Sequence, residues 1–425
     1  MIVYEVRRFY GGVHRVAEHA AQPTTKEHTL RPAKRISTAA LIAAIGASIL
    51  TVPQAAAMDS AHSSRSAEHR HSSLQESVDA IAATGPIGVL AQSTSHHRKR
   101  YATAGTADIA TGQAVHPNDR FRIASSTKTF VATVILQLVG EGRLSLDDTV
   151  DRWLPGVVSG NGNNGANITV RQLLQHTSGL YNYTADIPML ASVDGFQNNR
   201  YTTWTEGQLV AMAMNHHPDF APGTRWAYSN TNYILAGMIV RKVTGRSWQQ
   251  EVTERIIRPL GLHRTLAPTT ETHIPGRHLH GYSNFGGSGK TVDTTEFNPT
   301  AAGAAGAIIS TTADLTRFYT ALLGGRLLQP AQLSEMKTMV RTPDLDIVWP
   351  GASYGLGLMR IPLTCGGSYY SHAGDFPGYT TRDGVTDDGQ NVVVLETAGD
   401  GATDLSTEQA QNNLIDRELC AAQRQ

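Results

Sequence analysis

Three short motifs, far apart along the chain, constrain this sequence more than any other feature. In order they are Ser-x-x-Lys at Ser125–Lys128, Tyr-x-Asn at Tyr228–Asn230 and His-x-Gly at His372–Gly374. Each motif alone is weak, because such short patterns arise by chance in a chain of 425 residues. Each also has a structural interpretation: surface decoration, a turn, and a glycine that interrupts a strand. If the three motifs act together, the fold must bring them to one place.

Ser125 lies at the predicted start of a buried helix. The segment Phe121–Ile123 precedes it, and apolar residues after it recur at helical spacing until Gly140. Because Lys128 follows three residues later, both side chains would lie on one helix face. A serine hydroxyl becomes a good nucleophile only when a base takes its proton. Two bases are open: Lys128 with a lowered pKa, or Tyr228 with its pKa lowered by a charged Lys128.

Strand patterns occur near both ends of the chain, and helical patterns occur between them. The predicted strands are Gly85–Thr94, Lys99–Ala107, Tyr354–Ile361, Gly367–Ser371, Pro377–Asp383 and Asn391–Thr397. The predicted helices are Val170–Gln175, Glu206–Met214, Tyr233–Val243 and, at the end, Thr407–Cys420. This order predicts an α/β sheet domain with an all-helical insertion at about residues 143–300.

The first 57 residues have the pattern of a targeting segment. Basic residues up to Arg35 precede an uncharged stretch, whose apolar run Ala39–Val52 is followed by Ala55–Ala57. This pattern predicts a secretory signal peptide over residues 1–57. The alternative is an uncleaved membrane anchor, against which Pro53 and the shortness of the apolar run argue. A flexible spacer is expected at residues 58–76, followed by one domain at residues 77–421.

Charge and metal-ligand patterns exclude several classes of protein. The 36 basic residues balance 36 acidic ones, so the net charge favours neither nucleic acid nor an anionic membrane. The pairs His216/His217 and His278/His280 lack a carboxylate or cysteine at ligand spacing, so we expect no metal site. The chain has two cysteines, Cys365 and Cys420. In an exported chain we expect one disulfide, and the alternative is two unlinked thiols.

Longer segments around the motifs resemble the serine β-lactamase-related superfamily, and within it secreted D-alanyl-D-alanine carboxypeptidases related to class C β-lactamases. The segments are Phe121–Leu138, Ile168–Tyr181, Pro222–Gly237, Ala305–Leu315 and Tyr354–Leu358. The placement of the two cysteines also resembles the single disulfide of those carboxypeptidases. The resemblance covers roughly residues 77–421. It implies a five-stranded antiparallel sheet flanked by helices plus an all-helical lobe, with the active site between them and no metal or organic cofactor.

The same resemblance implies a role for each motif residue. Ser125 would be the acylated nucleophile, and Lys128 and Tyr228 would form the proton-transfer pair. Asn230 would hydrogen-bond to Lys128 and to the amide of the substrate. His372 would be the electropositive or hydrogen-bonding group of the third motif.

The third motif departs from the carboxypeptidase pattern. Gly374 would allow close backbone approach, and the N–H of Asp375 would form an oxyanion hole with that of the nucleophile. The carboxypeptidases usually carry hydroxyl residues where this chain has Ala373 and Asp375, and those hydroxyls help to hold the terminal carboxylate of the substrate. An Asp375 side chain in the site would repel that carboxylate. An arginine that contacts it corresponds to Arg360, or, one position out of register, to Met359.

These features predict a secreted bacterial serine hydrolase that forms an acyl-enzyme on Ser125. Its first predicted activity is that of a D-alanyl-D-alanine carboxypeptidase on peptidoglycan stem peptides. The alternatives with the same machinery are an esterase, a D-amino-acid peptidase or a β-lactamase. A non-catalytic binder or sensor that keeps the fold is the alternative from another class. We expect small peptide, ester or β-lactam ligands, no nucleic-acid partner, association with the cell wall, and a monomer.

Overall fold

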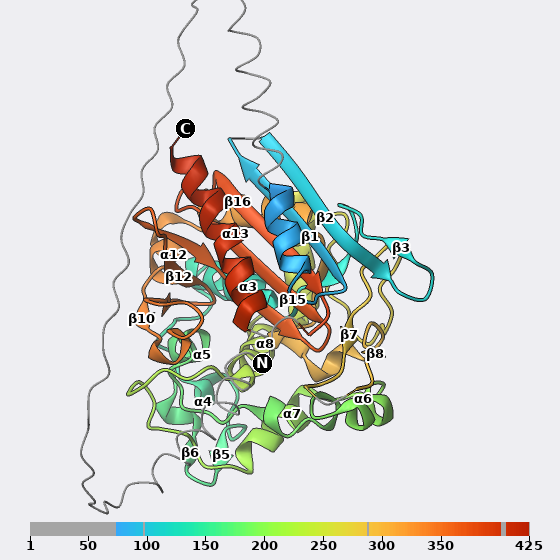
Figure 1. Ribbon diagram of the computed structural model, residues 1–425. Coiled ribbons are helices and arrows are strands. Elements are labelled where there is room, and N and C mark those ends of the chain that lie inside the picture. The colour runs from blue at the N-terminus through green and yellow to red at the C-terminus, as the bar shows by residue number, and fades with distance from the viewer. Residues whose placement is uncertain (1–73, 97, 287–288, 401–404, 425) are drawn as a thin grey trace, which may run out of the picture. The chain divides into compact units, whose positions relative to one another are not determined.

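The structure is a computed structural model, and it describes residues 74–96, 98–286, 289–400 and 405–424. Its centre is an antiparallel sheet that joins strands from the two ends of the described chain (Figure 1). The strands are β1 (Gly88–Ser95), β2 (Arg98–Asp108), β3 (Gln113–Ala114), β10 (Val340–Arg341), β11 (Ser353–Tyr354), β12 (Met359–Pro362), β13 (Ser368–Ser371), β14 (Gly374–Phe376), β15 (Tyr379–Val385) and β16 (Asn391–Ala398). Their order is β10-β11-β12-β13-β15-β16-β1-β2-β3, and β14 pairs with β15.

The sheet is wider than the five strands that the resemblance implies. Those five correspond to β13, β15, β16, β1 and β2, and short strands extend the sheet at both edges. The predicted strand Tyr354–Ile361 is wrong as a single element, because it forms the hairpin of β11 and β12. Its turn contains Gly357 with φ of 74°. A Cβ there would lie 2.6 Å from the Cβ of Ala132, so only glycine fits the turn.

Helices cover both faces of the sheet. On one face, α13 (Leu405–Gln423) lies beside a helix over residues 74–82 (Figure 1). On the opposite face, α11 (Thr312–Leu323) packs against β16 and β1. Successive side chains of a strand point to opposite faces. Accordingly, Arg382 of β15 contacts α13 and the next residue, Asp383, contacts α11.

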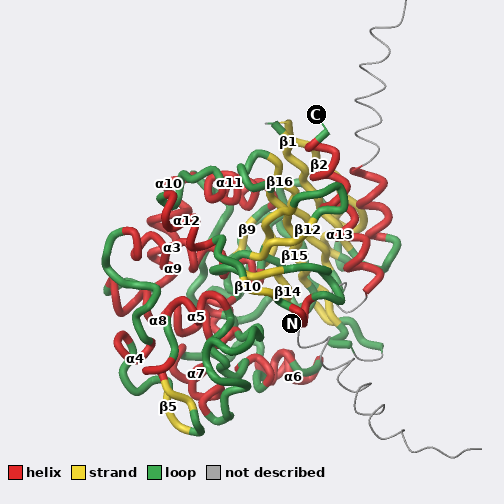
Figure 2. Tube along the Cα trace, turned by 90° about the vertical axis from the view of Figure 1, so that its left-hand side faces the viewer, coloured by secondary structure: helices red, strands yellow, loops and turns green. Residues whose placement is uncertain are grey.

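The helical part is built around α3 (Thr127–Gly140) and α8 (Asn230–Thr244), which pack against each other. Figure 2 shows the strands of the sheet on one side and the helices α4, α5, α7 and α8 on the other. The other helices are α4 (Val150–Trp153), α5 (Val170–Gln175), α6 (Val193–Asn199), α7 (Glu206–Met214), α9 (Trp248–Val252), α10 (Arg258–Leu260) and α12 (Pro330–Met336). Capping boxes begin α5, α7 and α9, which explains why the predicted bounds of α5 and α7 are confirmed.

The insertion at residues 143–300 is not all-helical as predicted, because it consists of short helices joined by long loops and also contains two short ladders. These are β5 (Ser159–Gly160) with β6 (Asn163–Asn164), and β7 (Tyr282–Ser283) with β8 (Val292–Asp293). The first ladder is possible because the turn residues between its strands, Asn161 and Gly162, both have positive φ.

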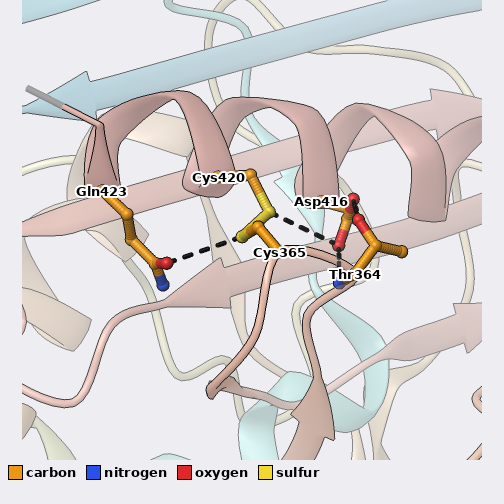
Figure 3. The surroundings of a disulfide bond; sticks show 5 residues. All are labelled: Thr364, Cys365, Asp416, Cys420 and Gln423. Atoms are coloured by element: carbon orange, nitrogen blue, oxygen red, sulfur yellow. Dashed lines mark hydrogen bonds between the residues drawn. A yellow bond between two sulfur atoms is a disulfide. The ribbon is translucent and has the colours of Figure 1, made fainter.

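The predicted disulfide between Cys365 and Cys420 is confirmed, with an S–S distance of 2.01 Å. It joins the turn between β12 and β13 to α13 (Figure 3). Beside it, the backbone N–H of Thr364 donates to the carboxylate of Asp416 at 2.8 Å, so the turn and the helix are linked twice.

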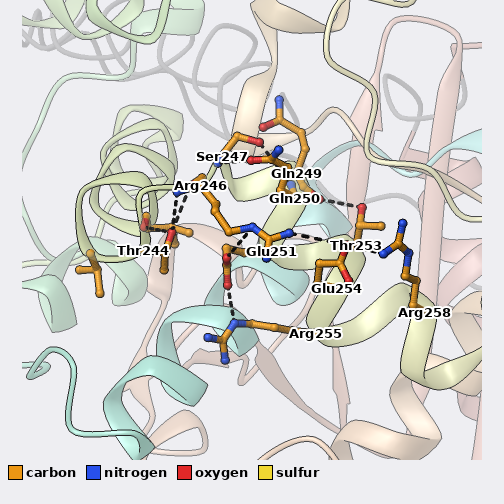
Figure 4. A network of polar contacts seen from close by, with 12 residues as sticks. Thr244, Arg246, Ser247, Gln249, Gln250, Glu251, Thr253, Glu254, Arg255 and Arg258 are labelled. Atoms are coloured by element: carbon orange, nitrogen blue, oxygen red, sulfur yellow. Dashed lines mark hydrogen bonds and ion pairs between the residues drawn. The ribbon is translucent and has the colours of Figure 1, made fainter.

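Ion pairs tie the far end of α3 to the helices that follow α8. Arg255 lies in a π-helical turn, η5 (Thr253–Ile257), and contacts Glu141, the residue after α3. It also contacts Glu251 at 2.5 Å, and Glu251 is paired with Arg246 (Figure 4). The pair with the exposed Glu141 contributes about 0–1 kcal/mol, as surface pairs do, whereas Glu251 is buried and its two arginines compensate its charge. These ion pairs link the C-terminal end of α3 to η5 and α9.

The predicted signal peptide at residues 1–57 and most of the predicted spacer lie outside the described residues. The last residues of that spacer, 74–76, belong to the first described helix. Across the described ranges, no helix combines the length and the apolar character needed to cross a membrane.

Candidate active site

Ser125 lies in a tight turn between a short strand and α3. The strand β4 (Phe121–Arg122) pairs with β9 (Ile309–Ser310), and a 3₁₀ turn, η1 (Ala124–Ser126), follows it. Ala124 has φ of 45°, a left-handed conformation that a non-glycine residue adopts at a cost. This conformation turns the chain sharply and leaves Ser125 partly exposed at the start of the buried helix.

Lys128 is fully buried, and three oxygen atoms surround its amine. Its Nζ lies 2.9 Å from Ser125 Oγ, 2.7 Å from Asn230 Oδ1 and 2.6 Å from the carbonyl oxygen of Ala305. Burial lowers the pKa of Lys128 well below its ordinary value, although the charge of Asp375 opposes this shift. In its uncharged form the amine has two N–H groups and one lone pair. Since both carbonyl oxygens can only accept, the lone pair is left facing Ser125 Oγ.

Asn230 is the first residue of α8, and its amide has a partner on each side. Oδ1 accepts from Lys128, while Nδ2 donates to Asn182 Oδ1 at 3.3 Å and to Thr184 Oγ1 at 3.4 Å. The backbone N–H of Asn230 also donates to Asn182 Oδ1 at 3.0 Å. These contacts fix the amide so that its oxygen faces the lysine.

Tyr228 lies just before α8, with its ring centre 4.9 Å from Lys128 Nζ. Its hydroxyl is buried and makes no hydrogen bond of good geometry within the described part of the chain. Burial raises the pKa of Tyr228 well above its ordinary value, and only the nearby hydroxyl of Ser125 offsets this effect. The phenol is therefore protonated and can donate a proton, whereas Lys128 is the member of the pair whose pKa is lowered.

His176 is a site residue that the sequence patterns did not single out. It ends α5 in a left-handed conformation, and its ring centre lies 4.2 Å from that of Tyr228. Its Nδ1 accepts from the backbone N–H of Ser229 at 3.2 Å and from Nδ2 of Asn232 at 3.1 Å. Its carbonyl accepts from the N–H of Ala227 at 3.1 Å. His176 thus holds the Tyr-Ser-Asn segment by the packing of its ring, by its ring nitrogen Nδ1 and by its backbone carbonyl.

His372 is buried and neutral. Burial, with a smaller contribution from a charge on Lys128, lowers the pKa of His372 to about 3. Its Nδ1 is 2.8 Å from the carbonyl oxygen of Ala373, so Nδ1 carries the proton and donates. Its Nε2 then accepts from the hydroxyl of Tyr354 at 2.8 Å. Of the two expected roles, the structure favours hydrogen bonding over positive charge.

The third motif lies directly against the turn Ala124–Ser126, which is called the nucleophile turn below. The hydroxyl of Ser126 donates to the carbonyl of His372 at 2.6 Å. A Cβ on Gly374 would lie 2.1 Å from the carbonyl oxygen of Ile123, so the close approach predicted for this glycine is present. Ala373 is buried and brings no hydrogen-bonding side chain to the site.

Asp375 is held by an ion pair on the face of the sheet that α13 covers. Its Oδ1 accepts from Arg382 Nη2 at 2.9 Å, and the same guanidinium contacts Glu408 of α13. The Arg382 side chain is 1% exposed and that of Asp375 is 8% exposed. The carboxylate is therefore paired with Arg382, and a simple repulsion of anionic substrates by Asp375 is not what the structure supports.

The structure does not bring Arg360 to the other site residues. Arg360 lies on β12 opposite Tyr370 and is exposed, whereas its neighbour Met359 is buried opposite Ser371. The site is thus assembled from the turn before α3, the segment before α8, and β13 with β14. The sequence patterns did not predict that Ala305, Tyr354 and His176 contact the motif residues. Each of the three nevertheless lies within a segment that carried the family resemblance.

Within the described ranges, no three His, Cys, Asp or Glu side chains are grouped so that they could hold a metal ion. A surface pocket of about 600 Å³ lies elsewhere, between η5 and the loop at residues 261–275, and none of the motif residues lines it.

Comparisons with known proteins identify relatives of this chain. A D-stereospecific amidohydrolase from Streptomyces sp. is 45% identical with a TM-score of 0.74, and the match covers 80% of this chain and 98% of that one. The D-amino acid amidase of Ochrobactrum anthropi SV3, complexed with L-phenylalanine, is 29% identical with a TM-score of 0.72, covering 83% and 98%. Penicillin-binding protein 4* of Bacillus subtilis (strain 168) is 29% identical over 293 residues, which are 65% of this chain and 60% of that protein.

Protein flp of Staphylococcus aureus is 33% identical over 195 residues, so the chain spans only 37% of that relative and 60% of penicillin-binding protein 4*. The model of the Beta-lactamase family matches residues 75–415, a range that contains all three motifs. The chain therefore belongs to the Beta-lactamase family of serine hydrolases.

Proposed function

We propose that this protein is a serine amidohydrolase that cleaves the amide bond on the carbonyl side of a D-amino acid, through an acyl-enzyme on Ser125. The observation that carries the proposal is the third motif. Its histidine is neutral, Ala373 has no polar side chain, and Asp375 is paired with Arg382. These residues offer nothing that would hold the terminal carboxylate of a peptide, which suits a substrate with an uncharged leaving group.

In the proposed reaction, neutral Lys128 takes the proton of Ser125 while Ser125 Oγ attacks the substrate carbonyl. The developing oxyanion is stabilised by the backbone N–H groups of Ser125 and Asp375. The C–N bond then breaks, and Tyr228 gives its proton to the departing nitrogen and recovers one from Lys128. Water attacks the acyl-enzyme by the same steps in reverse order, which releases the free acid and restores Ser125.

The stereochemical part of the proposal is supported by the solved relatives. The amidohydrolase at 45% identity is described as D-stereospecific, and the protein from Ochrobactrum anthropi is a D-amino acid amidase. In both cases the match covers 98% of the relative, so the whole catalytic domain is compared.

The test is a comparison of D-phenylalaninamide with L-phenylalaninamide, following ammonia release by the protein and by Ser125→Ala. We expect turnover of the D-amide, little turnover of the L-amide, and none with the variant. Equal turnover of both enantiomers would remove the stereochemical claim. Appreciable activity of Ser125→Ala would show that another residue is the nucleophile.

A second candidate is the D-alanyl-D-alanine carboxypeptidase predicted from the motifs, because penicillin-binding protein 4* is a relative. It requires recognition of a terminal carboxylate by groups other than those of the third motif. Release of D-alanine from an acetylated D-Ala-D-Ala peptide, faster than ammonia release from D-phenylalaninamide, would favour this candidate. A lasting adduct with benzylpenicillin on Ser125, seen by intact mass, would add to that case.

We also propose that the protein is exported. The basic, apolar and Ala-Ala-Ala pattern within residues 1–57 supports this, as does the disulfide, because such bonds persist in oxidising compartments. The test is expression of the full chain in a secreting bacterial host and mass spectrometry of the exported protein. We expect a mature N-terminus near Met58, whereas an intact N-terminus in the membrane fraction would indicate an anchor.

A further inference from the structure

Asp383 lies opposite the third motif in the sheet and is not part of any motif. In the register between β13, β14 and β15, Tyr370 faces Val385 and Gly374 faces Thr381. By the same register, His372 faces Asp383. The regular ladder is interrupted here, because β13 ends at Ser371 and β14 begins at Gly374.

The carboxylate of Asp383 takes the place of the missing ladder contact. Its Oδ1 accepts from the backbone N–H of His372 at 2.9 Å, and its Oδ2 accepts from the hydroxyl of Tyr319 in α11 at 2.9 Å. Asp383 and Tyr319 are both fully buried. A side-chain acceptor is longer than a backbone carbonyl, so it allows the strand to leave the regular pleat at His372 while its N–H stays bonded.

This contact is continuous with the nucleophile turn. His372 donates its backbone N–H to Asp383, and its backbone carbonyl accepts from the hydroxyl of Ser126 at 2.6 Å. Ser126 is the residue after the proposed nucleophile, and Gly374 is in contact distance of Ile123 before it. The position of the third-motif backbone relative to Ser125 is therefore set by Ser126 on one side and by Asp383 on the other.

We propose that Asp383 is a positioning residue of this active site, whose carboxylate holds the His372 N–H and thereby fixes the third-motif backbone against the nucleophile turn. The inference rests on the proposed function only in that the site must be catalytic. Asp383 does not touch the substrate in this proposal. It acts through the backbone that carries the N–H of Asp375.

The electrostatics of Asp383 agree with a role other than stabilisation. Burial raises the pKa of Asp383 to about 7, against the hydrogen bonds from His372 and Tyr319. Because the folded pKa lies above the unfolded value of 3.8, this group favours folding most at low pH. That contribution is lost as the pH rises through about 7, so the ionised carboxylate is not retained for stability above neutral pH.

The test compares Asp383→Ala with Asp383→Asn. The alanine removes the acceptor of the His372 N–H. The asparagine keeps an oxygen for that N–H and places its amide N–H groups toward the Tyr319 hydroxyl, which can accept. Tyr319→Phe is the matched control, since it removes only the second contact of the carboxylate. For each variant we would measure kcat and KM for D-phenylalaninamide, and the melting curve.

We expect Asp383→Ala to lower kcat by about 10- to 100-fold with KM within about twofold, as for a misplaced oxyanion donor. Asp383→Asn and Tyr319→Phe should stay within about threefold of the parent kcat. A cooperatively folded Asp383→Ala with parental kcat would overturn the proposal. So would equal losses in Asp383→Ala and Asp383→Asn, because the charge and not the hydrogen bond would then matter.

A second measurement separates this proposal from the proposed function. Hydrogen–deuterium exchange of a peptide that spans residues 371–376, without substrate, should be faster in Asp383→Ala and near parental in Asp383→Asn. If the parent protein turns over no amide, the proposed function fails while this comparison still decides the role of Asp383. If Asp383→Ala does not melt cooperatively, Asp383→Ser replaces it, because its hydroxyl is too short to reach the His372 N–H. Unchanged exchange in that variant would refute the positioning role.

Discussion

At the scale of single residues, the chemistry of the site depends on how Lys128 is buried. Its amine has three oxygen partners, none of which belongs to a carboxylate, so its burial favours the uncharged form. The motif spacing predicted that Lys128 and Ser125 share a helix face. It could not choose between Lys128 and Tyr228 as the base, because the carbonyl of Ala305 and the burial of both side chains come from elsewhere in the fold.

The burial of Lys128 predicts a pH dependence of stability. Its folded pKa lies below the unfolded value of 10.5, so the unfolded chain binds the extra proton and wild-type stability falls as the pH drops below that value. We expect the unfolding free energy of Lys128→Met, relative to wild type, to rise by at most about 1.4 kcal/mol per pH unit as the pH falls. Urea unfolding at several pH values measures it.

Lys242→Met is the control for this measurement, because Lys242 is an exposed lysine of α8. A difference between Lys128→Met and wild type that stays constant with pH would mean that Lys128 keeps its proton on folding. Lys128 would then be an ammonium in the resting enzyme.

Gly374 gives a second prediction at this scale. Gly374→Ala places a Cβ 2.1 Å from the carbonyl of Ile123, so β14 must move away from the nucleophile turn. We expect kcat to fall by about tenfold or more, since displacements of this size misalign the reacting groups. Gly207→Ala in α7, where the added Cβ meets nothing within 4 Å, should leave kcat unchanged. Steady-state kinetics of both variants decides, and a parental kcat for Gly374→Ala would contradict the steric argument.

At the scale of elements, the site is a junction of chain segments that hold one another in place. The segment before α8 carries Tyr228 and Asn230, and the end of α5 holds it through His176. Local patterns predicted α5, α7, α8 and most strands, because caps, turns and periodicity are local. They failed at Tyr354–Ile361, where the turn at Gly357 is imposed by packing against α3. They also missed the pair of Asp375 and Arg382, which depends on strand register.

His176 gives the prediction that belongs to this scale. His176→Ala removes the acceptor of the Ser229 N–H and puts alanine at a φ of 60°, so Tyr228 should lose its fixed position. His176→Asn tolerates that conformation and offers a side-chain oxygen near the same place. We expect kcat to fall by about 10-fold or more for alanine and clearly less for asparagine, with both measured alongside thermal melts. Equal kcat values in the two variants would count against this role of His176.

At the scale of the whole molecule, the disulfide closes a long loop that contains the third motif. The bridge spans 55 residues, from the turn before β13 to α13. A loop of that length predicts a loss of up to about 4 kcal/mol when both cysteines become serine. We expect kcat to stay within about twofold, because the bridge contacts none of the motif residues. Chemical denaturation with and without a reductant measures the effect, and a large loss of kcat at full folding would show that the bridge also shapes the site.

The ion pair behind the third motif bears on how substrate preference can change during evolution. Arg382 is buried against two carboxylates, Asp375 from the motif and Glu408 from α13. If Asp375 becomes a hydroxyl residue, the type found there in the carboxypeptidases that this chain resembles, Arg382 still keeps one anionic partner. A substitution of Asp375 therefore does not leave the buried guanidinium of Arg382 without an anionic partner. A change of residue at position 375 is therefore compatible with a folded domain.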